Sequence, residues 1–89
     1  MLDTRIFTAQ LDGQDVIGAE VFVDATPIAR VVCVNVKTRL DNTADYRVTL
    51  RENKVERTKM LYGFDRDRGA LELIHDAVEL MRAKAQGRY

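Results

Sequence analysis

The two side chains best suited to nucleophilic or metal chemistry are the only thiol and the only imidazole, Cys33 and His75. A cysteine nucleophile needs a histidine within hydrogen-bond reach and an accessible, electropositive site. Cys33 instead lies in the apolar run Val31–Val34, where a cysteine behaves as a small hydrophobic side chain. We therefore interpret Cys33 as a buried core residue and predict no catalytic residue.

The spacing of Glu72 and His75 is also found in helices that bind metal ions through a carboxylate and a histidine. Such di-metal sites draw ligands from four helices, and zinc needs three or four converging ligands. The sequence predicts a single helix. We interpret His75 as part of a solvated acidic surface that includes Asp76 and Glu79.

Four residues between positions 41 and 52 have the spacing of calcium ligands in an EF-hand loop: Asp41, Thr43, Asp45 and Glu52. The sixth position of such a loop is glycine, whereas here it is Tyr46, and strand patterns flank the segment where helices should be. We interpret the spacing as coincidental. We predict no metal and no other cofactor.

A cluster of basic residues lies in a segment that is predicted to form a β-hairpin. Its members are Arg47, Arg51, Lys54, Arg57 and Lys59. Alternation places Arg47 and Arg51 on one outward face, and Arg57 and Lys59 are expected to join them across the hairpin. Such a row has the charge to contact phosphates or another anion. However, no aromatic residues interleave for base stacking, and exposed basic residues also protect sheet edges from aggregation. The solvated face is therefore the favoured interpretation.

The apolar patterns predict an α+β fold with about five antiparallel strands followed by one C-terminal amphipathic helix packed on a sheet face. The expected strands span about 4–11, 15–23, 28–38, 46–51 and 55–64, and the helix spans about 69–86.

The pair Asp12–Gly13 predicts a tight turn between the first two strands. A two-residue loop places Phe7 opposite Gly18, whereas a three-residue loop gathers Phe7 and Ile17 on one face. These registers place opposite sets of side chains on each face, and both remain open.

The apolar patterns of the third and fifth expected strands predict which of their side chains face the core. Residues 28–38 are apolar on both faces, which favours a central strand that is covered on both sides. In residues 55–64 the side chains expected to point inward are Met60, Tyr62 and Phe64.

Apolar residues of the expected helix recur with a period of 3.6 residues: Leu71, Ile74, Val78, Met81 and Ala85. Asp67 is the expected N-cap and Gly87 the expected C-cap. A second set of apolar residues lies beside this stripe, and at 100° per residue the two sets together cover about half of the helix circumference. The second set comprises Ala70, Leu73, Ala77 and Leu80. Because one sheet face needs less apolar surface, we expect the excess to contact a second subunit in a homodimer.

Length and composition narrow the class of protein. With 89 residues, 46% hydrophobic and 31% charged, the chain fits one folded domain and is too apolar for intrinsic disorder. The N-terminal residues do not resemble a signal peptide, one cysteine cannot form an internal disulfide, and no apolar run is long enough to span a membrane. We therefore expect a cytoplasmic protein with no membrane segment.

The first functional hypothesis is a non-enzymatic protein–protein interaction or regulatory module with an unidentified protein partner. The alternative is a nucleic-acid-binding protein that uses the basic hairpin from Arg47 to Lys59. The third is a small enzyme or ligand-binding subunit with a site at a dimer interface.

Overall fold

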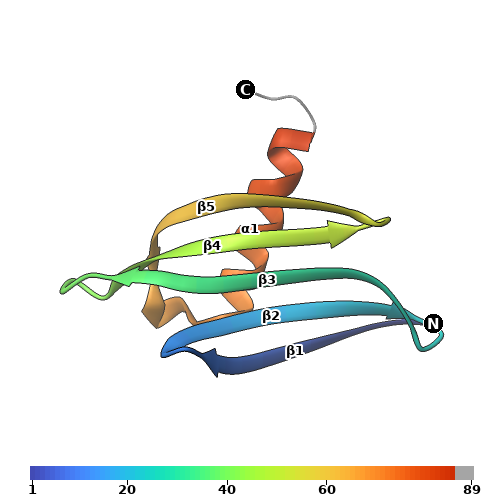
Figure 1. Cartoon of the computed structure of the whole chain (residues 1–89), viewed down its shortest axis with the longest axis horizontal. Coiled ribbons are helices and arrows are strands. Elements are labelled where there is room, and N and C mark those ends of the chain that lie inside the picture. The colour runs from blue at the N-terminus through green and yellow to red at the C-terminus, as the bar shows by residue number, and fades with distance from the viewer. Residues whose placement is uncertain (86–89) are drawn as a thin grey trace.

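The expected strands and helix are all present in the computed structural model, which describes the backbone of residues 1–85 and the side chains of residues 1–82. The elements are β1 (Leu2–Leu11), β2 (Gln14–Val23), β3 (Thr26–Thr38), β4 (Thr43–Glu52), β5 (Val55–Asp65), the short 3₁₀ helix η1 (Arg66–Arg68) and α1 (Gly69–Ala85). The strands form one antiparallel sheet in the order β1-β2-β3-β4-β5, and α1 passes behind it across the strands (Figure 1). The α+β prediction is confirmed. The predicted C-cap at Gly87 lies outside the described residues.

The first hairpin has the two-residue loop. Asp12 and Gly13 have φ angles of 53° and 78°, and two consecutive positive φ angles are what a type I′ turn requires. This turn places Phe7 directly opposite Gly18. The alternative register, which gathers Phe7 and Ile17 on one face, is wrong because the two side chains lie on opposite faces.

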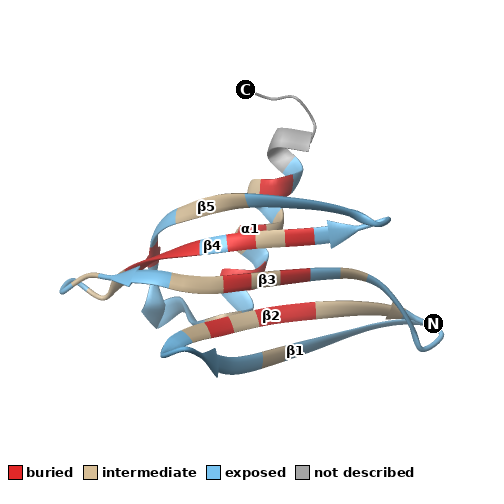
Figure 2. Ribbon diagram, viewed as in Figure 1, coloured by how far each residue is buried: buried red, intermediate tan, exposed pale blue. Residues whose placement is uncertain are grey.

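The hydrophobic core lies between α1 and the sheet face toward the helix (Figure 2). Its sheet residues include Ala19, Val31, Cys33, Tyr46, Val48, Leu50 and Phe64. The rings of Tyr46 and Phe64 meet edge to face with their centroids 6.1 Å apart. Burial of these side chains drives the packing of the helix on the sheet. The structure confirms Cys33 as a core residue and β3 as the central strand, although α1 covers only one face of β3 within residues 1–85.

The buried stripe of α1 is rotated relative to the predicted one. Its buried side chains are Leu73, Ile74, Ala77 and Met81. Leu71, which was expected in the stripe, is 70% exposed. The buried stripe draws on both sets of apolar positions that the periodicity allowed, Ile74 and Met81 from the first and Leu73 and Ala77 from the second. The side chain of Ala85 lies outside the described part of the chain.

The start of the helix also differs from the prediction. The carboxylate of Asp65 accepts a hydrogen bond from the backbone N–H of Asp67 at 3.0 Å and so caps η1. Asp67 lies inside η1, and α1 begins two residues later at Gly69. Asp67 is therefore not the N-cap, because a short 3₁₀ helix comes between the last strand and the α-helix.

A β-bulge in β5 changes which of its side chains face the core. Tyr46 pairs with Leu61 but Ala44 pairs with Phe64, so β5 holds one residue more than β4 over this stretch. Gly63 has a φ angle of 70° at the bulge. Phe64 is buried as expected, whereas Tyr62 is 69% exposed. The expected inward set is thus wrong for Tyr62, and also for Met60, which lies on the opposite face from Leu61.

Candidate interaction surface

The sheet face opposite α1 is not covered by any element of residues 1–85. Residues directly opposite each other on neighbouring strands share a face, so the pairing register arranges this face in rows across the sheet. We define the open face as three such rows. The charged row is Arg5, Glu20, Arg30, Arg51 and Glu56, the central row is Phe7, Gly18, Val32, Thr49 and Thr58, and the third row is Ala9, Val16, Val34, Arg47 and Met60.

The middle of the open face is apolar. The ring of Phe7 lies over Gly18 so closely that a Cβ atom at position 18 would be 2.3 Å from Phe7 Cζ. The guanidinium of Arg30 in turn stacks on the Phe7 ring, with Cζ 5.2 Å from the centroid. Val32 and Val34 are only partly buried beside this stack. Apolar side chains are therefore left in contact with water at the centre of the face.

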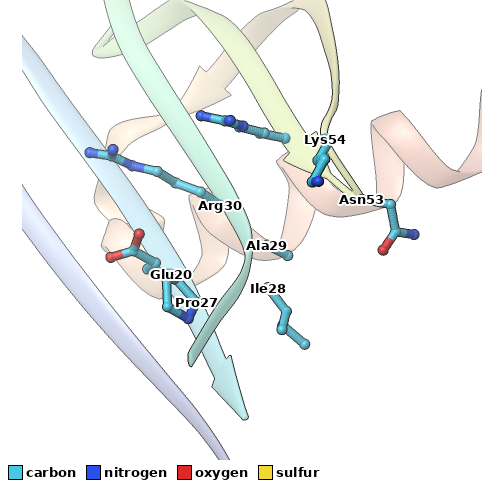
Figure 3. A pocket seen from close by; sticks show the side chains of 8 residues that line it. Glu20, Pro27, Ile28, Ala29, Arg30, Asn53 and Lys54 are labelled. Atoms are coloured by element: carbon cyan, nitrogen blue, oxygen red, sulfur yellow. The ribbon is translucent and has the colours of Figure 1, made fainter. Parts of the chain in front are cut away.

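Two arginines of the charged row lie directly opposite each other. Arg30 on β3 pairs with Arg51 on β4, and like charges at opposite positions destabilise a sheet. Neither guanidinium forms an ion pair or side-chain hydrogen bond with the described residues. Both line a shallow hollow of about 450 Å³ that also includes Glu20 and Lys54. In Figure 3, Arg30 extends from β3 across β2, on the side where Glu20 lies. The row is thus rich in exposed charge.

The predicted basic residues are divided between the two faces. Arg47 and Arg51 lie on the open face, and Lys54 lies at the turn beside the hollow. Arg57 pairs with Leu50, and Lys59 pairs with Val48, on the face toward α1.

The expectation that these last two residues join Arg47 and Arg51 is therefore wrong. The physical reason is the two-residue turn at Asn53–Lys54, which pairs Glu52 with Val55 and so sets Arg51 opposite Glu56.

Sequence reasoning did not find Arg5 and Arg30 as members of this surface. Each lies on a different strand from the basic hairpin, so no local cluster indicates them. The only signal in the sequence is alternation within each strand, and it combines into a row only when the registers of all four strand pairs are known.

Cys33 and His75 do not share a site. Cys33 has no exposed surface, and burial raises the pKa of its thiol to about 12, so it stays protonated at neutral pH. His75 lies on the solvent side of α1, with its ring nitrogens 3.7 Å from Asp76 Oδ1 and 3.8 Å from Glu79 Oε1. The interpretations of a structural cysteine and of a solvated acidic helix surface are both confirmed.

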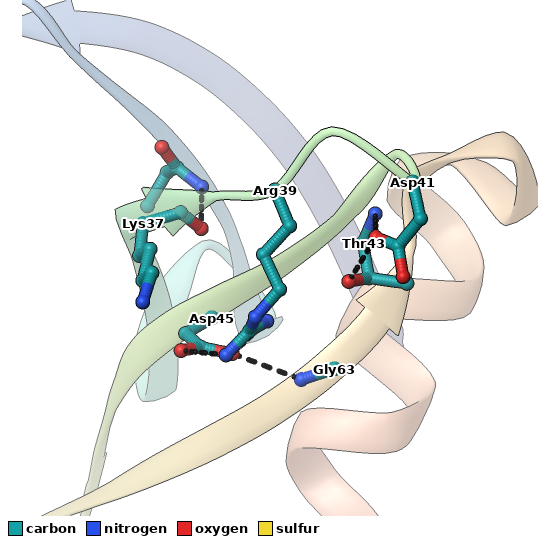
Figure 4. A network of polar contacts seen from close by, with 7 residues as sticks. Lys37, Arg39, Asp41, Thr43, Asp45 and Gly63 are labelled. Carbon is teal, nitrogen blue, oxygen red and sulfur yellow. Dashed lines mark hydrogen bonds and ion pairs between the residues drawn. The ribbon is translucent and has the colours of Figure 1, made fainter.

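The carboxylates of the segment from 41 to 45 are engaged in internal hydrogen bonds (Figure 4). The two terminal guanidinium nitrogens of Arg39, Nη1 and Nη2, each donate to Asp45 at 2.7 Å, and the backbone N–H of Gly63 donates to it at 3.0 Å. These bonds lower the pKa of Asp45. Asp41 accepts from the N–H and hydroxyl of Thr43, which lowers the pKa of Asp41. The network therefore holds the β3–β4 loop and the β5 bulge in place.

No group of three or more His, Cys, Asp or Glu side chains within the described part of the chain is placed to hold a metal ion. The helix that the structure describes is also not long and apolar enough to cross a membrane.

In comparisons with known proteins, no family model, no curated protein and no solved structure matches this chain. Its fold class is therefore taken from the structure itself. It is an α+β protein with a five-stranded antiparallel sheet, of which one face packs on a helix and the other is left uncovered by residues 1–85.

Proposed function

We propose that this chain is a non-enzymatic protein–protein interaction module and that the open face is its binding surface. The observation that carries the proposal is the partly exposed apolar centre formed by Phe7, Val32, Val34 and Met60 on a face that α1 leaves uncovered. Protein interfaces combine such an apolar centre with a polar rim, and they are enriched in aromatic residues, methionine and arginine. The arginines of the open face supply that rim.

The size of the sheet face that contains these three rows also supports this role. Five strands at a spacing of about 4.8 Å and a length of about 33 Å give the whole face an area of about 800 Å², of which the three rows make up about half. Each partner in a stable protein complex typically contributes about 800 Å² of surface. The sheet is thus large enough to form an interface without help from the helix.

Nucleic-acid binding is the second candidate, and it is supported by the four arginines of the open face, Arg5, Arg30, Arg47 and Arg51. Two features of the same surface make it less favourable. Glu20 and Glu56 lie in the charged row and would repel phosphates. Phe7 in the central row and Phe22 beside the charged row already stack with Arg30 and Arg5, so these rings are less free to stack with bases.

Site-specific photo-cross-linking tests the proposal. A benzophenone amino acid replaces Thr58, an exposed residue of β5 on the open face. The matched control is Thr8, an exposed threonine on the other edge strand, β1, which pairs with Ile17 on the face toward α1. After irradiation in the source cells, we expect a discrete protein adduct from position 58 and none from position 8.

The adduct should also disappear when Val34 is replaced by aspartate and persist when the fully exposed Leu40 is replaced by aspartate. Equal adducts from both positions, or none from position 58, would refute the interaction role. An adduct that is removed by nuclease would establish the nucleic-acid alternative instead.

A further inference from the structure

The signs of the charged row are the observation on which this inference depends. From β1 to β5 they run positive, negative, positive, positive, negative. When a reversed copy of this row is placed opposite the row itself, unlike charges meet at the two edge strands, β1 and β5, and at the two strands next to them, β2 and β4. Only Arg30, on the central strand, meets its own sign.

Resting on the interaction role proposed above, we propose that the partner of the open face is a second copy of this chain. The two sheets pack face to face about a twofold axis that runs parallel to β3 and between the sheets. Sheets in such packings lie about 10 Å apart with their strands within about 30° of each other. This symmetry exchanges β1 with β5 and β2 with β4.

Under this symmetry the charged row is complementary to itself. Arg5 faces Glu56 of the partner subunit, and Glu20 faces Arg51 of the partner subunit. Because a twofold interface repeats every contact, each of these pairs occurs twice. The like-charge contact at Arg30 occurs once, on the axis, and each Arg30 is also stacked on the Phe7 ring of its own chain.

A second symmetrical arrangement of the two sheet faces is disfavoured by the same charges. An axis that runs along the charged row, perpendicular to the strands, places each charged residue on its own copy. Every contact in the row then joins like charges, which costs free energy on docking. The charge pattern therefore favours the axis parallel to β3 over an axis along the charged row.

The apolar rows agree with this axis. Val32 and Val34 on the central strand meet their own copies close to the axis, where an interface is most completely buried. In the third row, Ala9 faces Met60 of the partner subunit. Arg47 is exposed and faces the partner's Val16, which is already buried within its own chain, so the charged end of Arg47 extends to the rim.

Arg5 and Glu56 allow a test that only a contact between copies can pass. They lie on the two edge strands, four strand spacings or about 19 Å apart, so they do not touch within one chain. We expect the purified chain to form dimers in sedimentation velocity at concentrations between micromolar and millimolar. Arg5→Glu and Glu56→Arg should each weaken the dimer about tenfold, since each turns two unlike pairs into like pairs.

Combining the two substitutions should restore dimerisation. The double variant Arg5→Glu/Glu56→Arg again pairs unlike charges, and so does an equimolar mixture of the two single variants, which should form heterodimers. Within its own chain, Arg5 stacks on Phe22 and lies 3.5 Å from Asp3, and Arg5→Glu removes both contacts. They are still missing in the mixture, so a rescue there must come from the contacts between the two chains.

Arg57→Glu and Glu52→Arg are the matched controls. They make the same charge changes at exposed strand positions on the face toward α1, and they should leave the dissociation constant unchanged. Far-UV circular dichroism verifies that every variant is folded.

A wild-type chain that remains monomeric at 10.1 kDa throughout, or a dimer that the charge swap does not rescue, would overturn this inference. Failure of the inference differs from failure of the interaction role. A monomer whose position 58 still cross-links to a different protein retains the interaction role. A monomer that shows no adduct at that position loses both.

Discussion

Replacing Gly18 with alanine tests how closely β1, β2 and β3 approach one another at the centre of the open face. The new Cβ atom would lie 2.3 Å from Phe7 Cζ and 2.7 Å from the backbone oxygen of Val31. Both separations are shorter than van der Waals contact, so the ring and the β3 backbone must shift. Overpacking of this kind costs about 1–3 kcal/mol in the free energy of unfolding.

If the close approach of Phe7 and Val31 is ignored, Gly18→Ala is expected to raise the free energy of unfolding instead of lowering it. Gly18 has no positive φ angle, and an alanine in a strand interior is favoured over glycine by about 0.5–1 kcal/mol, chiefly because the unfolded chain loses less entropy on folding. The structure predicts a net destabilisation of up to about 2 kcal/mol, whereas backbone propensity alone predicts stabilisation. The sign of the change therefore decides between the two arguments.

Urea unfolding followed by far-UV circular dichroism measures this difference, and Phe7→Ala supplies the second arm of a double-mutant cycle. Two of the three shortest contacts involve the Phe7 ring, so Gly18→Ala should cost less in the Phe7→Ala background. Gly63→Ala is the control for backbone strain, because position 63 has a φ angle of 70° and open space around it. Its cost of about 1 kcal/mol should not depend on Phe7. A Gly18→Ala chain as stable as the parent would refute the packing argument.

Three further outcomes follow from the core, the Asp45 network and the buried thiol. Leu73→Ala should lower the free energy of unfolding by about 2–5 kcal/mol, whereas Leu71→Ala should change it by less than about 0.5 kcal/mol, because Leu73 is fully buried and Leu71 is 70% exposed. Since the pKa of Asp45 is lowered in the folded state, its ion pair stabilises the fold above the unfolded pKa of about 4, and this contribution is lost as the pH falls through the folded pKa. Asp45→Asn should therefore lower the Tm at neutral pH, and its difference from the parent should shrink in acid; a constant difference would contradict this. Because burial raises the pKa of Cys33 to about 12, a thiol reagent should modify it at neutral pH only after denaturant is added, and rapid modification of the native chain would contradict its position in the core.

Local patterns were sufficient to predict the five strands and the α-helix of this chain, although not the short 3₁₀ helix between them. Alternation and turn residues predicted five antiparallel strands, and the 3.6-residue period predicted a helix from residue 69. The apolar neighbours of Cys33 were enough to place it in the core. These predictions succeed because backbone preference and the burial of one face act over a few consecutive residues.

Tertiary structure alone decided which side chains meet. Alternation within one strand assigns residues to two faces, but the relation between strands depends on register, and a slip of one residue exchanges the faces. The Asn53–Lys54 turn thus separated Arg57 from Arg51, and the bulge at Gly63 returned Phe64 to the core face although Tyr62 points outward.

The open face shows most clearly that the pattern within one strand cannot determine which residues of neighbouring strands lie together. The sequence by itself determined which residues alternate along each strand. The row from Arg5 to Glu56, on which the proposed dimer depends, draws one residue from each of five strands. It exists only because four independent strand registers align them, and that alignment is a property of the folded sheet.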